Sequence, residues 1–230
     1  MNKLKKILAT ATTVAMLSTP AISGEGLEGF SIGVTASSNT FSLAGQEVIN
    51  RIGEKKKESY SKDKDVDVSS VFIEMTGAGG SSIGIEWIPG THNFGQESRA
   101  LTGNDGGDAV VHKADGEITN HITFYAEPTY MFGSAAGMQM GAFVTAGIHR
   151  FGLNTIESLP NSEYGDRNVW GGMYGLGFKG VYDSGLFFKV KGTHSQYLKF
   201  DMQSTGSDGS TEIHGVDISN NALKLAVGYN

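Results

Sequence analysis

The sequence predicts an all-β fold: an eight-stranded antiparallel up-and-down transmembrane β-barrel with four long extracellular loops and three short periplasmic turns. Three observations lead to this prediction. Stretches that alternate apolar and polar residues occur eight times along the chain. Short and long connections alternate between these stretches. The N-terminal segment has charged, apolar and small residues in the order found in an export signal. Because alternation alone also fits a soluble β-sandwich, the choice of a barrel depends on the other two observations.

The N-terminal segment has the pattern of a secretory signal peptide. Three lysines precede an apolar stretch from Ile7 to Leu17, and small residues follow up to Ser23. We therefore divide the chain into a signal peptide, residues 1–23, and an outer-membrane β-barrel, residues 24–230. This division predicts export to the cell outer membrane.

Composition excludes several classes of protein. The 230 residues include no cysteine, which excludes a disulfide framework, a thiol nucleophile and a thiolate metal site. Without the three lysines of the signal peptide, 15 basic residues face 24 acidic ones, a net charge of −9, which opposes nucleic-acid binding. No apolar run reaches the roughly 18 residues of a membrane-spanning helix. We expect neither a cofactor nor a metal.

Each of the first four stretches carries an apolar face. Every second residue is apolar or aromatic, and its neighbours are mostly small, polar or charged. The apolar faces are Phe30, Ile32, Val34 and Ala36 in residues 29–37; Val71, Ile73 and Met75 in 71–76; Ile83, Ile85 and Trp87 in 82–88; and Ile122, Phe124, Ala126, Pro128, Tyr130 and Phe132 in 120–132.

The other four stretches repeat this pattern. Their apolar faces are Met140, Ala142, Val144, Ala146 and Ile148 in residues 138–149; Trp170, Tyr174, Leu176, Phe178 and Tyr182 in 169–182; Leu186, Phe188 and Val190 in 186–195; and Leu223, Leu225, Val227 and Tyr229 in 221–230. A strand places successive side chains on opposite faces, so period 2 predicts a strand in each case. Pro128 has no free edge to occupy in a closed barrel, so we expect a bulge there.

The connections set the topology. Three are short, GAGG, GSAAG and DSG, and four are long and polar, residues 39–67, 89–117, 150–168 and 196–220. Both termini of the chain that forms the barrel then lie on the short-turn side, as in transmembrane β-barrels. Loops of this length would be unusual inside a compact soluble domain.

With these features the mature chain resembles the small eight-stranded outer-membrane barrels of Gram-negative bacteria, the OmpA/OmpX/OmpW-like group, over nearly its whole length. The resemblance implies apolar faces toward lipid, and outer-membrane lipids, lipopolysaccharide and the barrel-assembly machinery as partners. That machinery reads a terminal aromatic residue; Tyr229 occupies the matching register, and Asn230 follows it. We expect Tyr229→Ala to impair assembly and deletion of Asn230 to be tolerated.

Two sets of site residues follow from the alternation. Aromatic residues near strand ends fit membrane-interface girdles: Phe30, Trp87, Tyr130, Phe132, Trp170, Tyr182 and Tyr229. Charged residues on the inward face form one belt near the short turns, a lumen charge network: Glu74, Glu86, Glu127, Lys179, Lys189, Lys191 and Lys224. Side chains just fill an eight-stranded barrel, so these charges must pair with one another.

Several motifs invite other functions. GLGFKG, residues 175–180, matches a dinucleotide fingerprint but lies within a strand pattern. His194 and Ser195 are adjacent and should point to opposite faces, which argues against a hydrolase. The run 54–65 reads as a solvated mobile loop, or as a contact for lipopolysaccharide phosphates through Lys55, Lys56, Lys57, Lys62 and Lys64. The Gly/Asp-rich segments containing Asp105, Asp108 and Asp208 read as loops rather than calcium sites.

The leading functional prediction is a non-enzymatic structural anchor for surface loops with at most a narrow channel. A small porin-like channel for small solutes and a surface adhesion or recognition protein are alternatives. A soluble secreted β-sandwich is the alternative from another fold class.

Overall fold

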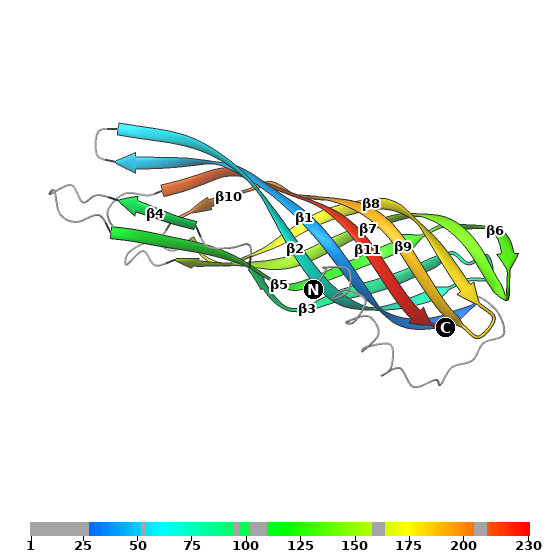
Figure 1. Ribbon diagram of the computed structural model, residues 1–230. Coiled ribbons are helices and arrows are strands. Elements are labelled where there is room, and N and C mark those ends of the chain that lie inside the picture. The colour runs from blue at the N-terminus through cyan, green and yellow to red at the C-terminus, as the bar shows by residue number, and fades with distance from the viewer. Residues whose placement is uncertain (1–27, 52–53, 94–96, 102–109, 158–163, 205–210) are drawn as a thin grey trace.

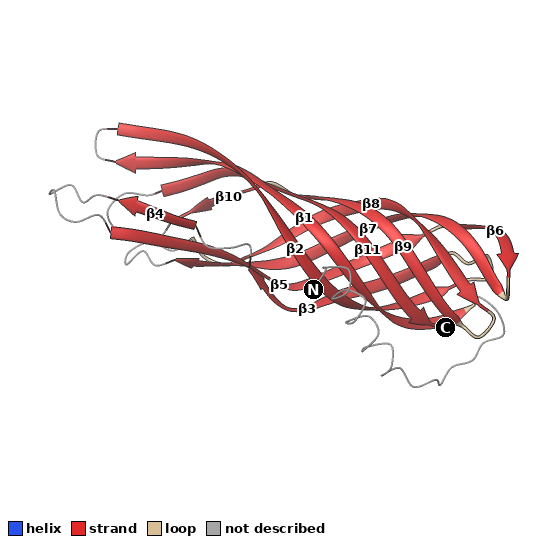
Figure 2. Cartoon of the chain, in the orientation of Figure 1, coloured by secondary structure: helices blue, strands red, loops and turns tan. Residues whose placement is uncertain are grey.

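The computed structural model describes residues 28–51, 54–93, 97–101, 110–157, 164–204 and 211–230. The predicted signal peptide and the three aspartates weighed as calcium ligands lie outside these residues. The regular elements of the described residues are strands (Figure 2). These residues include no helix long and apolar enough to cross a membrane.

Eleven strands make up the fold. They are β1 (Gly29–Arg51), β2 (Glu54–Thr76), β3 (Ser82–Asn93), β4 (Glu97–Leu101), β5 (Val110–Glu127), β6 (Thr129–Ala135), β7 (Met138–Glu157), β8 (Arg167–Tyr182), β9 (Leu186–Tyr197), β10 (Phe200–Gln203) and β11 (Thr211–Tyr229).

Eight of these strands close into a ring. Antiparallel pairing runs β1–β2–β3–β5–β7–β8–β9–β11 and returns to β1. The three short strands extend this ring, because β4 pairs with β5 beyond β3, β6 pairs with β7 beyond β5, and β10 pairs with β11 beyond β9. The predicted eight-stranded antiparallel barrel is therefore confirmed, and Figure 1 shows it as a tilted cylinder.

The two ends of the barrel differ. At the short-turn end, tight turns join β2 to β3, β6 to β7 and β8 to β9. The last strand ends there too, since the Asn230 N–H donates to the Gly185 carbonyl at 3.0 Å. At the opposite, long-strand end, β1, β2 and β11 project together while β4 and β5 form a separate arm (Figure 1).

The first predicted long loop is a strand pair. β1 and β2 stay in register from Gly29↔Thr76 to Arg51↔Glu54, so the segment 39–67 is almost entirely ladder. The prediction of a mobile loop at residues 54–65 is wrong, because this run forms the start of β2. Backbone pairing does not need an apolar face. Where both faces of a sheet carry polar residues, alternation of hydrophobicity disappears although the strand continues.

The expected bulge at Pro128 is also wrong. The pairing of β5 with β7 ends at Ala126↔Ala146, and that of β6 with β7 begins at Thr129↔Phe143, in the same register. The Val144 N–H donates to the Pro128 carbonyl at 3.2 Å. The proline thus interrupts the ladder only through its missing donor, and the register shifts later, between Met131 and Gly133.

Side chains divide between the two surfaces of the barrel wall as the alternation predicts. Large apolar residues such as Leu176 and Phe178 are exposed on the outside, whereas Glu74, Lys189 and other charged residues are buried inside. A soluble β-sandwich would show the reverse, so that alternative is wrong. The interior beyond the charged residues holds an apolar cluster at the long-strand end: Phe41, Ile118, Phe151, Leu153, Val169, Tyr197, Met202, Val216 and Ile218.

Candidate functional site: the barrel lumen

The lumen near the short-turn end contains a belt of seven charged side chains from six strands. They are Glu74 on β2, Glu86 on β3, Glu127 on β5, Lys179 on β8, Lys189 and Lys191 on β9, and Lys224 on β11. All seven are among the buried residues of the chain. These are the residues that the sequence assigned to the lumen, and the structure brings six of them into direct contact with one another in two groups.

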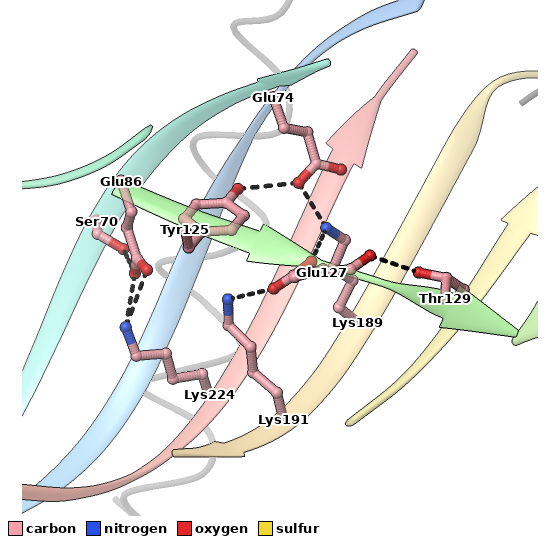
Figure 3. A network of polar contacts seen from close by, with 9 residues as sticks. All are labelled: Ser70, Glu74, Glu86, Tyr125, Glu127, Thr129, Lys189, Lys191 and Lys224. Carbon is pink, nitrogen blue, oxygen red and sulfur yellow. Dashed lines mark hydrogen bonds and ion pairs between the residues drawn. The ribbon is translucent and has the colours of Figure 1, made fainter. Parts of the chain in front are cut away.

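The larger group is centred on Glu127, which is completely buried. Its Oε2 lies 2.6 Å from the Nζ of Lys189, and its Oε1 lies 2.8 Å from the Nζ of Lys191 (Figure 3). Lys189 also contacts Glu74 at 2.5 Å, and the Tyr125 hydroxyl donates to the same Glu74 oxygen at 2.9 Å. Two carboxylates thus share two ammonium groups, which is the pairing that buried charges need.

The smaller group joins Glu86 and Lys224. The Lys224 ammonium lies 3.0 Å from Oε1 and 2.9 Å from Oε2 of Glu86, and the Ser70 hydroxyl donates to Oε1 at 2.6 Å. These residues come from β2, β3 and β11, on the opposite side of Tyr125 from Glu74 in Figure 3. The carboxylate therefore has hydrogen bonds to both of its oxygens.

Aromatic rings surround the ammonium groups. The Lys189 Nζ lies 5.4 Å from the Phe187 ring centroid and 5.7 Å from that of Phe72, and the Lys191 Nζ lies 4.7 Å from that of Tyr125. Such contacts stabilise a desolvated cation. They also fill the space around the ion pairs with ring carbon, which leaves little room for water in the belt.

Lys179 differs from the other six. Among the described residues it forms no ion pair, and its ammonium donates to the carbonyl oxygen of Gly80 in the turn between β2 and β3. With all seven groups ionised, three carboxylates face four ammonium groups, so the belt carries one net positive charge close to the short-turn opening.

A cavity lies between the charged belt and the apolar cluster. Lys224 borders it on one side and Phe41 and Ile118 on the other, and its wall includes the buried imidazoles of His121 and His149. The His149 ring stacks on Tyr197, with the ring centroids 4.4 Å apart. The volume is about 30 Å³, which is room for only a few water molecules.

The sequence analysis missed both the cavity and the apolar cluster. It assigned the long-strand end to loops, so Phe151, Tyr197 and Ile218 were not recognised as inward-facing. A signal was present, because the inward alternation of β7 continues through Phe151 and Leu153, and that of β9 through Ser195 and Tyr197. The strands could have been extended by following the inward face instead of the outward one.

The seven predicted interface aromatics all lie on the outward side of their strands. Six of them are well exposed, and Tyr229 is partly exposed. Five belong to strand segments at the short-turn end, Phe30, Tyr130, Phe132, Tyr182 and Tyr229, while Trp87 and Trp170 stand farther toward the long-strand end. The apolar outer surface of the barrel is therefore bordered by aromatic side chains toward each end.

The structure places two motifs that suggested other functions, GLGFKG and His194–Ser195, within strands of the barrel wall. GLGFKG lies within β8, not in a turn before a helix. Ser195 is buried in the lumen, whereas the His194 ring faces outward and its Nδ1 lies 2.8 Å from the Asn221 side-chain oxygen. The predicted divergence of His194 and Ser195 is confirmed.

Polar contacts also order the long-strand end. The Gly215 N–H donates to Asp201 Oδ1 at 2.6 Å, and this bond lowers the pKa of the Asp201 carboxyl. Lys199 pairs with Asp217 at 2.9 Å and lowers the pKa of that carboxyl. The first contact joins β11 to β10 and the second joins β11 to the residue just before β10, so they hold the projecting strands together.

No protein-family model matches the sequence, and no curated protein matches it. Solved structures that are similar in fold include the following three. The outer membrane protein OprG from Pseudomonas aeruginosa is 11% identical, with a TM-score of 0.46 over 90% of this chain and 100% of that chain. Neisserial surface protein A is 8% identical, with a TM-score of 0.36 over 84% and 96%. Ail, the attachment invasion locus protein of Yersinia pestis, is 12% identical, with a TM-score of 0.31 over 84% and 97%.

Proposed function

We propose that the chain is a non-enzymatic outer-membrane protein whose closed barrel anchors the strands that project from its long-strand end. One observation carries this proposal: apolar side chains cover the outside of a closed barrel whose buried interior holds paired charges. Such a surface is stable against lipid and unstable against water, and a closed barrel leaves no unpaired edge in the hydrocarbon.

The dimensions of the outward surface support this proposal. On β8 the aromatic limits are Trp170 and Tyr182, 12 residues apart, which is about 40 Å along the strand at roughly 3.3 Å per residue. A tilt of about 45° reduces this length to about 28 Å along the barrel axis, close to the roughly 25 Å apolar band of outer-membrane barrels. The chain would reach this membrane through the predicted signal peptide and the barrel-assembly machinery.

The second part of the proposal is that the lumen is closed. Paired charges, aromatic rings and the apolar cluster block the interior in succession, so the barrel should not conduct steadily. The protein purified in detergent should migrate differently on a gel before and after heating, and should precipitate when detergent is removed without added lipid. In planar bilayers it should show no steady conductance. Migration unaffected by heating together with solubility in detergent-free buffer would reject the membrane barrel, and a large steady conductance would reject closure alone.

The porin-like alternative is favoured by the charge of Lys179, which forms no ion pair with the described residues. If ions cross the belt, the net positive charge should make the current anion-selective, and Glu127→Lys should strengthen that selectivity. Liposome uptake of small anionic and cationic solutes, compared for the wild type and Glu127→Lys, separates this function from an anchor. An unchanged selectivity in the variant would remove Glu127 from the pathway.

The projecting strands favour a surface recognition role as a second alternative. β1 and β2 remain paired to Arg51↔Glu54, far beyond the apolar band. Lysines on this projecting part of β2, including the exposed Lys57, would meet lipopolysaccharide phosphates that lie outside the hydrocarbon. Substituting Lys57 and Lys64 by Gln should weaken binding to lipopolysaccharide micelles but not to neutral detergent micelles. Equal binding by wild type and variant would count against this contact.

A further inference from the structure

The lumen cavity contains three possible metal donors that the ion-pair belt does not use, two imidazoles and one thioether. His121, His149 and Met173 all line it, and their exposed fractions are 7%, 1% and 5%. The Nε2 atoms of both histidines are buried and have no hydrogen-bond partner among the described residues. Buried polar atoms in folded proteins normally bond to protein, to water or to a ligand. Two unsatisfied imidazole nitrogens in one cavity therefore call for a partner there, either water or a bound ligand.

The barrel wall places these groups side by side. β5, β7 and β8 are consecutive in the ring, with the pairs Thr123↔His149 and Gly147↔Met173. The His121 and His149 ring centroids are 5.4 Å apart. At Gly171, opposite His149, an added Cβ would lie 2.5 Å from the His149 Nε2. This glycine allows the imidazole to extend toward β8, the strand that carries Met173.

A local irregularity turns His121 into the lumen. Ile118 and His121 are three residues apart and both point inward, which regular alternation does not allow. The register of β5 shifts between Thr119 and Ile122 against β7, and Asn120 has a φ of 51°. β-Bulges reorient side chains in this way and are common next to functional sites. The irregularity adds His121 to the cavity wall at the level of His149.

The donors select the kind of guest. Imidazole binds several transition metals, but a thioether prefers soft ions such as copper(I). In the described part of the chain no three His, Cys, Asp or Glu side chains are arranged to hold a metal, so no carboxylate joins this set. The nearby Glu86 already binds Lys224 and Ser70. A site without an anionic donor favours an ion of single charge over a divalent one, because less charge must be desolvated.

We propose that His121, His149 and Met173 bind one copper(I) ion within the barrel lumen. The cavity volume of about 30 Å³ suits an ion and a water molecule rather than an organic solute. Its wall also includes Val68, Ile88 and His92, beyond the last β2–β3 pair at Val71↔Trp87. The ion would enter through this unpaired part of the wall, past His92.

The test is copper(I) binding by the folded barrel in detergent, without oxygen and with ascorbate as reductant. A coloured copper(I) chelator competes for the metal, and the bound copper is counted per chain. The wild type should retain one copper(I). His121→Ala and Met173→Leu should each weaken the site at least about tenfold, since even outer-shell changes cost 10–100-fold in metal sites. X-ray absorption should show nitrogen and sulfur neighbours in the wild type and only nitrogen or oxygen in Met173→Leu.

His194→Ala is the matched control, because His194 faces outward on β9 and contacts Asn221. It should bind copper(I) as the wild type does. Heat-modifiable migration confirms that each variant is folded; should His121→Ala fail to fold, His121→Asn replaces it. Wild type that loses all copper to a weak chelator, or affinity unchanged in both lumen variants, would overturn the site. So would equal loss in His194→Ala, since binding would then be to surface histidines.

Discussion

Glu127 should be the most destabilising carboxylate to remove from the lumen. It has ion pairs with both Lys189 and Lys191, and the two lysines depend on it unequally. Lys189 keeps Glu74 at 2.5 Å after Glu127→Gln. Lys191 loses its only ion-pair partner among the described residues and remains buried beside Tyr125.

The magnitude follows from that difference. Glu127→Gln leaves one buried ammonium group without a counter-charge, and breaking a buried pair in this way costs about 3–5 kcal/mol. Glu74→Gln is the comparison, because Lys189 then keeps Glu127, and the amide oxygen of Gln still accepts from the Tyr125 hydroxyl. Exchanging a charged acceptor for a neutral one should cost about 1 kcal/mol. The free energy of unfolding should therefore fall more in Glu127→Gln than in Glu74→Gln.

A double variant identifies the cause. Lys191→Met removes the uncompensated charge and keeps an unbranched side chain of similar length. Glu127→Gln with Lys191→Met should regain most of the stability lost in the single variant, since a buried pair can be replaced by neutral groups at little cost. The assay is reversible urea unfolding in lipid vesicles, followed by tryptophan fluorescence and by heat-modifiable migration.

Two results would refute this reasoning. A loss below about 1 kcal/mol in Glu127→Gln would mean that water or a rearranged lysine compensates the charge, as at an exposed pair. A double variant no more stable than the single one would mean that shape, not charge, sets the cost. Either result would remove the basis for a dry, closed belt.

Three further predictions concern other parts of the barrel. Leu176→Arg should destabilise the barrel by about 2–4 kcal/mol and Leu198→Arg by about 0–1 kcal/mol. Both side chains are about two-thirds exposed, but only Leu176 lies within the apolar band. Equal losses in vesicle unfolding would mean that the band is placed wrongly. Phe151→Ala should cost about 3–5 kcal/mol, because this fully buried ring fills the apolar cluster, and a loss under 1 kcal/mol would show that the cluster is loosely packed. Asn230→Ala should cost about 1–3 kcal/mol for two hydrogen bonds, since its side chain accepts from Ser31 and donates to the Glu28 carbonyl. Wild-type stability of this variant would support the expectation that loss of Asn230 is tolerated.

The sequence predicted the barrel best where the two faces of the wall differ most. Along Leu186–Val190 an apolar residue alternates with Phe187 and Lys189, and the structure places each on the expected side. The lumen charges share this advantage, because a lysine within an otherwise apolar strand stands out. Which carboxylate binds which lysine could not be predicted, since Glu127 and Lys191 lie on strands that are not neighbours and meet only across the lumen.

Prediction failed where the contrast between the faces disappears. In β2 the run from Lys62 to Asp65 carries charge on both faces, so nothing in its hydrophobicity marks a strand, yet its backbone pairs fully with β1. Asn230 shows another limit. As one polar residue after the last strand pattern it had no assigned role, but ring closure brings it beside Ser31, 199 positions earlier in the chain.

One half of the interior contains paired charges and the other contains apolar side chains, and together they favour a closed barrel. Near the short turns, charged side chains must find partners inside the wall, and six of the seven belt residues do so within 3.0 Å. Toward the long-strand end, Phe151, Tyr197 and Ile218 fill the interior with apolar groups that need no partner. A conducting pore would need a continuous polar path through both halves. The boundary between them is the cavity with unsatisfied imidazoles, so a small guest can be held there without opening either half.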